Sequence, residues 1–377
     1  MSLFDEPAVD DHAPLVELDG EAIEGLSPAR ENLLCFGFDD LEQSLLKAFN
    51  ADRFPHAIIL AGPTGIGKAT FAYRVARFLL AQEPGGGLFG GDVAPAVTME
   101  ISAENPVVRR ISSGGHADIL TVGRVYDEKK KKLSNDIPVD EVRKITPFLR
   151  KTSSEGGWRV VIVDDAHHLN RSSQNALLKI LEEPPKKTVL ILVADQPGRF
   201  LPTIRSRCQI YNCSLMADDH VRSLLLKYDQ SLTPDKITAL ANLGQGRVGR
   251  AIELMEAGGL EIYQDIIDLL SKLPKVDVQF CYDLSETLGK DERRYDLYLR
   301  LLRDILMDMA RLQTRGQLPP TVTGQDAEVF ERLSKIYTPK EWLNIWEEVK
   351  TIYEETKRMH LDKAQAVLSV IWAMEKG

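Results

Sequence analysis

The stretch GPTGIGKAT, residues 62–70, decides which fold the sequence predicts. It matches the phosphate-binding pattern G-x-x-x-x-G-K-[ST] except at its last position, where Ala69 replaces the hydroxyl residue and Thr70 follows one place later. The apolar run HAIILAG before it predicts a buried strand, and KATFAYRVARFLLA after it predicts a helix. Because strand, glycine loop and helix follow in the order that cradles a phosphate, we predict an α/β domain with a phosphate-binding loop.

The loop has the residues that bind phosphate, but it lacks the residue that normally binds Mg²⁺. Ala69 has no oxygen to offer Mg²⁺, and Thr70 lies about 100° further round the helix, so it points elsewhere. We therefore expect phosphate binding to be retained and metal-assisted hydrolysis to be impaired. The candidate nucleotide-binding residues in the loop are Gly62, Thr64, Gly65, Gly67, Lys68 and Thr70.

A second candidate stretch is WRVVIVDDA, a buried strand that ends in two acids. In such folds Asp164 would hold Mg²⁺ through water, and the next residue, usually a Glu, would polarise the attacking water. Here that residue is Asp165, and a shortfall of about 1 Å can cost on the order of a hundredfold in rate. The alternative interpretation is that both acids only end the strand. His167 and His168 follow without a second ligand cluster, so we expect no metal role for them.

Strand and helix signals divide the 377 residues into regions. The first 29 residues carry eight Asp or Glu and no Lys or Arg, which predicts a flexible acidic arm. Apolar strands and helical stretches then alternate up to about residue 214, as in a mainly parallel sheet covered by helices, with a glycine-rich exposed loop at 83–96. Beyond residue 215 only helical patterns remain. The predicted order is α/β first and all-α afterwards.

Composition excludes several classes of protein. We expect a cytoplasmic protein, because no apolar run reaches the roughly 18 residues of a membrane helix and the first residues lack a signal-peptide pattern. A net charge of −9 argues against a chain that coats nucleic acid alone. The four cysteines are scattered and are predicted to be reduced, structural thiols, namely Cys35, Cys208, Cys213 and Cys281.

Three groups of basic residues are candidates for contact with phosphates. Arg205 and Arg207 in LPTIRSRC are either surface charges or, for Arg207, a planar cation offered to another subunit's triphosphate. The run Lys129–Lys132 is typical of a solvated loop. The predicted helix VDEVRKITPFLRK offers Arg143 and Lys144 as the better candidates for contact with DNA, because charges on a helix are held in place.

Together, GPTGIGKAT, VVIVDDAHHLNRSSQNALLKILEEPP and LPTIRSRC resemble the bacterial clamp-loader ATPases of the AAA+ class. The resemblance covers most of the chain from about Pro28 onward. It implies a five-subunit ring of gamma/tau-type motor subunits and a clamp-opening delta subunit, which loads a sliding clamp onto primed DNA. The particular likeness is to the family's stator subunit, which has a defective nucleotide site and presents Arg207 of the S-R-C motif to its neighbour. The resemblance also implies a helical lid at 215–262, an all-α collar at 263–377, and ATP or ADP with Mg²⁺ as the ligand of the loop.

Several departures from the family pattern favour the stator. The interval 71–159 has no cysteine, so the zinc module of some relatives is not expected. The hydroxyl residue that senses the γ-phosphate is replaced by Ala194, with Asp195 beside it, and Gly249 stands where motor subunits carry a sensing arginine. Two alternatives stay open. One is an active motor subunit that uses Thr70, and the other is an unrelated P-loop phosphotransferase.

Overall fold

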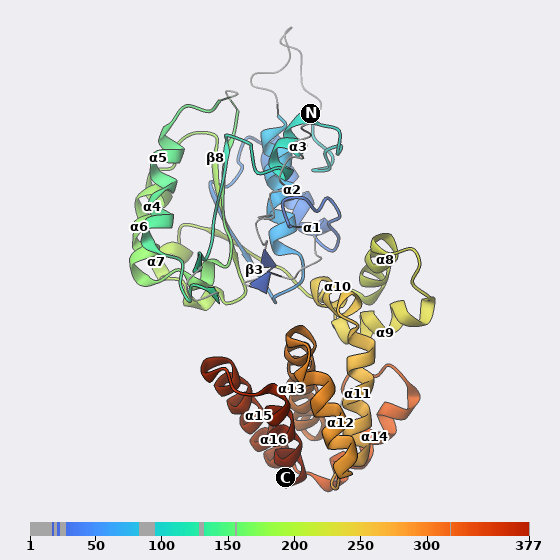
Figure 1. Cartoon of the computed structure of the whole chain (residues 1–377). Helices are drawn as coiled ribbons and strands as arrows, with labels where there is room; N and C mark the ends of the chain where they lie inside the picture. The colour runs from blue at the N-terminus through green and yellow to red at the C-terminus, as the bar shows by residue number, and fades with distance from the viewer. Residues whose placement is uncertain are drawn as a thin grey trace, which may run out of the picture. The chain divides into compact units, whose positions relative to one another are not determined.

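The computed structural model describes residues 17–18, 21–22, 28–82, 95–127, 132–154, 157–316 and 318–376. The chain divides into two compact units, Met1–Met216 and Ala217–Gly377 (Figure 1). Most of the predicted acidic arm, most of the glycine-rich loop and residues 129–131 of the lysine run lie outside the described residues. The division of the helical part into lid and collar at residue 262 stays a prediction.

The first unit is built on a five-stranded sheet in which every pair of neighbouring strands is parallel. Its order is β4-β7-β8-β3-β9. The three central strands are buried on both faces, which explains why they read as unbroken apolar runs. The predicted fold class, an α/β domain followed by helices, is confirmed. The strands are β3 (Ala57–Ala61), β4 (Ile119–Val122), β7 (Arg159–Val163), β8 (Thr188–Ala194) and β9 (Gln209–Asn212).

Helices cover both faces of this sheet, with α1 to α3 on one side and α4 to α7 on the other (Figure 1). Alternate strand residues such as Ile59, Val161 and Leu192 pack against buried side chains of the second group, among them Leu177 of α6. Asn170 is the N-cap of α6, since its Oδ1 accepts a hydrogen bond from Ser173 N at 2.9 Å. The helices are α1 (Asp39–Asn50), α2 (Lys68–Leu80), α3 (Pro106–Ser112), α4 (Val139–Arg143), α5 (Ile145–Arg150), α6 (Arg171–Glu182) and α7 (Pro202–Arg205).

One predicted helix is two. The stretch 139–151 was expected to be continuous, but it breaks at Lys144 between α4 and α5. The reason is Pro147, which has no N–H to donate to the carbonyl of Arg143 four residues earlier. Short two-residue strands and single 3₁₀ turns complete this unit: β1 (Glu17–Leu18), β2 (Glu21–Ala22), β5 (Tyr126–Asp127), β6 (Lys132–Leu133), η1 (Ala166–His168) and η2 (Pro197–Arg199).

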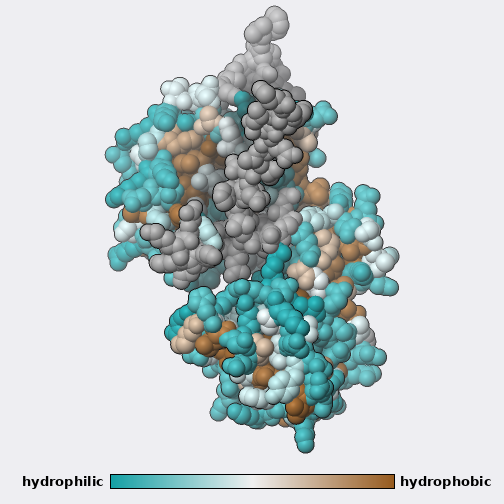
Figure 2. Space-filling view, viewed as in Figure 1, coloured by the Kyte–Doolittle hydropathy of each residue, from teal (hydrophilic) through white to brown (hydrophobic). Residues whose placement is uncertain are grey.

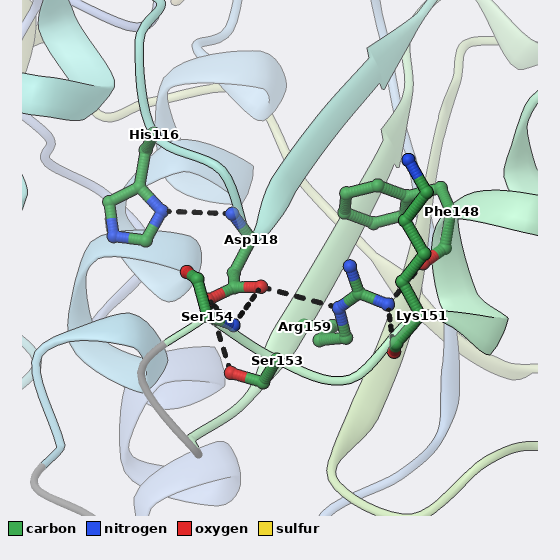
Figure 3. A network of polar contacts seen from close by, with 7 residues as sticks. All are labelled: His116, Asp118, Phe148, Lys151, Ser153, Ser154 and Arg159. Carbon is green, nitrogen blue, oxygen red and sulfur yellow. Dashed lines mark hydrogen bonds and ion pairs between the residues drawn. The ribbon is translucent and has the colours of Figure 1, made fainter.

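A buried polar network ties the amino-terminal ends of β4 and β7 together (Figure 3). Asp118, which is 2% exposed, accepts hydrogen bonds from Ser153 Oγ, from the backbone N–H and hydroxyl of Ser154, and from Arg159 Nε at 3.3 Å. Arg159 also donates to the carbonyl groups of Phe148 and Lys151. Burial raises the pKa of the Asp118 carboxyl, but the hydrogen bonds from Ser154, Ser153 and Arg159 outweigh it and hold the pKa below its usual value.

The second unit consists of helices, and no strand occurs in residues 217–316 and 318–376. In Figure 2, hydrophilic residues cover most of its visible surface, as expected where amphipathic helices turn their apolar faces inward. Trp342 and Tyr298 are among its fully buried side chains. None of the described helices has the length and apolar character needed to cross a bilayer. The helices are α8 (Asp218–Tyr228), α9 (Pro234–Gly244), α10 (Val248–Glu256), α11 (Gly259–Lys272), α12 (Val278–Gly289), α13 (Glu292–Arg315), α14 (Gly324–Ile336), α15 (Pro339–Met359) and α16 (Lys363–Lys376).

The Asp118 network yields a prediction about stability. Asp118→Ala leaves the buried Arg159 without its carboxylate and should lower the free energy of unfolding by about 3 kcal/mol at pH 7. Because the pKa of Asp118 is lowered in the folded protein, its stabilisation is present above the unfolded value of about 3.9 and is lost as the pH falls through the folded pKa. Denaturant unfolding of the variant and the wild type should therefore converge in acid.

The matched control for this variant is Asp140→Ala. Asp140 pairs with Arg143 on the surface, and its side chain is 80% exposed. Its removal should change stability by about 0.5 kcal/mol or less. Equal losses in the two variants at pH 7 would contradict a special role for the buried network.

Candidate functional site

The glycine loop between β3 and α2 requires glycine at Gly65 and Gly67 for their backbone conformation and at Gly62 because of a close approach. Gly65 and Gly67 have φ values of +79° and +93°, in the left-handed region that favours glycine, and Gly67 caps α2. A Cβ on Gly62 would lie 2.3 Å from the carbonyl oxygen of Cys213. The loop conformation predicted from the sequence thus depends on glycine at all three positions.

Lys68 and its two neighbours lie at the buried first turn of α2. The Lys68 side chain is 2% exposed, and its Nζ donates to the carbonyl of Pro63 at 2.7 Å, across the loop. Ala69 and Thr70 are buried as well, at 4% and 5% exposure. Among the predicted loop residues, Thr64 is the one whose side chain is tied to another strand end, since its Oγ1 donates to Asp195 Oδ2 at 3.3 Å.

The two acids after β7 differ in their surroundings. Asp165 has a left-handed backbone (φ 49°), is 6% exposed and pairs with Arg124, whose Nη2 lies 2.9 Å from its Oδ2. The N–H of Asp165 donates to Asp164 Oδ1 at 3.0 Å. The carboxylate expected to polarise water is therefore held by a cation of its own chain. Sequence reasoning missed Arg124, because only the pairing of β4 with β7 in the sheet brings it beside Asp165.

Asp195, directly after β8, forms the third acidic position at this edge of the sheet. Its Oδ1 lies 3.0 Å from His167 Nδ1, and the rings of His167 and His168 are 4.2 Å apart. Burial raises the pKa of Asp195, but His167, Lys68 and Thr64 outweigh burial and lower it overall. Within the described ranges no three His, Cys, Asp or Glu side chains gather as metal ligands would.

These residues fit a phosphate group better than they fit Mg²⁺. The left-handed glycines, the first turn of α2 and the buried Lys68 together suit an anion. Ala69 supplies no oxygen for a cation, and Asp165 is already neutralised by Arg124. If a nucleotide is bound, Lys68 and the loop N–H groups of this chain would hold its phosphates.

Arg207 lies between α7 and β9, before the first residue of β9. Its side chain is 35% exposed. Nη2 pairs with Glu182 Oε1 at 3.0 Å, and Nη1 donates to the carbonyl of Thr203 at 3.0 Å. The neighbouring Cys208 is buried, and burial raises the pKa of its thiol to about 12, so the thiol stays protonated. Arg207 is thus a partly exposed surface cation with a known orientation.

The other predicted basic residues are paired as well. Arg143 lies 2.9 Å from Asp140 and Lys144 lies 2.6 Å from Glu141, one turn back on the same helix, and both cations are more than half exposed. Arg250, next to Gly249, pairs with Asp304 of α13 at 2.8 Å. Arg143 and Lys144 are therefore accessible, and Arg250 is committed to a contact within the helical unit.

This arrangement defines a class of protein. The strand that leads into the phosphate loop, β3, is separated from the acid-bearing β7 by one inserted strand, β8. A parallel sheet of this order with a glycine loop at the end of β3 is a P-loop fold of the AAA+ class.

Comparisons with known proteins narrow the class. Residues 38–216 match the model of the family described as DNA polymerase III, delta subunit. The chain is 29% identical over 295 residues to the DNA polymerase III subunit delta' of Escherichia coli K12. The aligned residues make up 78% of this chain and 81% of that protein. The delta' subunit of Pseudomonas aeruginosa is 38% identical over 160 residues, 42% of this chain and 43% of that protein. The family model and these relatives agree with the resemblance seen in the motifs, and both relatives are delta' subunits of DNA polymerase III.

A solved structure is also similar over most of the length. The DNA polymerase III gamma subunit-related protein of Thermotoga maritima covers 89% of this chain and 99% of its own, at 16% identity and a TM-score of 0.40.

The close approach at Gly62 yields a prediction. Gly62→Ala would push a methyl group into the Cys213 carbonyl and should lower stability by about 1–3 kcal/mol, because backbone on both sides must shift. The matched control is Gly123→Ala, where an added Cβ meets nothing within 4 Å. Thermal unfolding of both variants checks this. A Gly62→Ala variant as stable as the control would contradict the geometry described for the loop.

Proposed function

We propose that this chain is a clamp-loader subunit in DNA replication, acting as a stator that completes a neighbour's ATP site with Arg207. The similarity to delta' subunits of DNA polymerase III supports the clamp-loader role. The proposed partners are gamma/tau-type motor subunits and a delta subunit in a five-subunit ring, with the sliding clamp and primed DNA met through the assembly in the cytoplasm. The helical lid at 215–262 and the collar at 263–377 are part of this proposal.

The observation that carries the finger assignment is the setting of Arg207. Its partner Glu182 is 52% exposed, so the pair is a surface salt bridge, and such pairs contribute about 0–1 kcal/mol. Exchanging Glu182 for the triphosphate of another subunit would therefore cost little. The hydrogen bond to Thr203 meanwhile keeps the guanidinium at the end of α7. An arginine supplied in trans stabilises the charge that develops in phosphoryl transfer.

The chain's own loop supports the stator over the motor. Ala69 offers no metal ligand, and the ion pair with Arg124 engages the Asp165 carboxylate that would polarise water. Thr70, the residue that an active motor would need, is 5% exposed in the first turn of α2. We propose that ATP or ADP can be held here without efficient hydrolysis.

Contact with DNA by Arg143 and Lys144 is a subsidiary proposal. Both side chains are exposed, and their pairs with Asp140 and Glu141 are surface pairs that exchange readily for phosphate contacts.

The isolated chain should hydrolyse ATP poorly. We expect a turnover on the order of a hundredfold or more below that of an isolated motor subunit. The reason is that Asp165, in the position of the water-polarising group, is one methylene shorter than a Glu and is paired with Arg124. A phosphate-release assay on the two purified subunits measures this. Turnover comparable to the motor subunit would instead establish the active-motor alternative.

The finger itself is tested by Arg207→Ala in a reconstituted ring. The hydrolysis rate at the neighbouring site that receives Arg207 should fall on the order of a thousandfold. The DNA-stimulated ATP turnover of the whole assembly should therefore fall by the fraction that this one site contributes. The matched control is Arg205→Ala, which removes an exposed guanidinium two residues away and should leave turnover unchanged. Unaltered turnover with Arg207→Ala, in rings shown to assemble, would defeat the assignment.

A further inference from the structure

Asp195 lies beside the phosphate loop because of backbone pairing. The N–H of Gly62 donates to the carbonyl of Ala194 at 3.1 Å. This hydrogen bond places Asp195, the next residue, beside the phosphate loop. The hydrogen bond from Thr64 Oγ1 to Asp195 Oδ2, at 3.3 Å, fixes the carboxylate against the loop itself. The position is thus set by β8 and by the loop together.

The partners of Asp195 favour its carboxylate form. His167 lies 3.0 Å away, and Lys68 and Thr64 also favour the carboxylate, so that its pKa is lowered despite burial. Of the other acids at this edge, Asp165 is paired with Arg124, and Asp164 accepts the N–H of Asp165. Asp195 therefore adds a fixed negative charge within reach of the lysine that an anionic ligand would also need.

We propose that Asp195 makes the phosphate loop selective for a nucleoside diphosphate over a nucleoside triphosphate. The inference rests on the proposed retention of a nucleotide in this loop. A triphosphate carries more negative charge than a diphosphate, and a carboxylate a few ångströms from the loop repels it more strongly where water is partly excluded. Mg²⁺ would offset this repulsion, but Ala69 provides no ligand to place it there.

A selective loop of this kind has a consequence within the ring. The chain would stay in one nucleotide state while the motor subunits bind, hydrolyse and release ATP. Asp195 would then act as a specificity-determining residue that keeps the stator from following the ATP cycle. Arg207 is not involved in this selectivity.

The alternative role for Asp195 is purely structural, as an acceptor that anchors Thr64. Two variants separate the roles. Asp195→Asn keeps a side-chain oxygen for the Thr64 hydroxyl and removes the charge. Thr64→Val removes the hydroxyl and keeps the charge.

Calorimetric titration of the full chain with ADP and with ATP, each in EDTA and in Mg²⁺, tests the proposal. The wild type should bind ADP roughly tenfold or more tightly than ATP. Asp195→Asn should bring the two dissociation constants to within about twofold by strengthening ATP binding, whereas Thr64→Val should retain the preference for ADP. Lys68→Ala should weaken both ligands and confirms that binding is at the loop.

Three results would overturn the inference. They are equal affinity of the wild type for ADP and ATP, an equal effect of Asp195→Asn on both ligands, and no binding of either ligand by wild type or variant. None of these results bears on the finger, because Arg207 is measured through turnover at the neighbour's site. The two proposals can thus fail separately.

Discussion

Two backbone hydrogen bonds at the carboxyl end of β3 hold the candidate site together. The N–H of Gly62 is bound to β8, and the carbonyl of Ala61 accepts the N–H of Cys213 at the end of β9 at 2.6 Å. Gly62 lacks a side chain where the Cys213 carbonyl passes. These contacts align three strand ends at one edge of the sheet, so that the loop, Asp195 and the chain that follows the S-R-C motif are placed by the same short stretch.

The polar residues at this edge form a set of internal partners rather than an open catalytic array. Arg124 holds Asp165, and His167 and Thr64 contact Asp195. A motor subunit needs a carboxylate that is free to orient water, because proton transfer and positioning both depend on geometry. In this chain the carboxylate at that position, Asp165, is already paired with Arg124. The geometry accordingly supports a part that presents a group to others more than one that turns over substrate.

Much of the fold could be predicted from the sequence because its signals are local. Apolar runs gave the central strands, the glycine loop gave the strand-to-helix turn, and Asn170 gave the start of α6. The break at Lys144 could also have been predicted from the sequence, because Pro147 causes it, but a continuous helix was predicted instead. The pairs of Arg124 with Asp165 and of Arg207 with Glu182 could not be read from spacing, because they join segments 41 and 25 residues apart that only the sheet brings together.

The strand order leaves two outer strands, β4 and β9, and each has only four residues. A long unpaired strand would offer a row of backbone donors and acceptors onto which another chain could add, which is a route to aggregation. Two short ones leave little of that template. In the assembly proposed above, the chain would therefore meet other subunits through side chains on its surface and not by adding strands to its β-sheet.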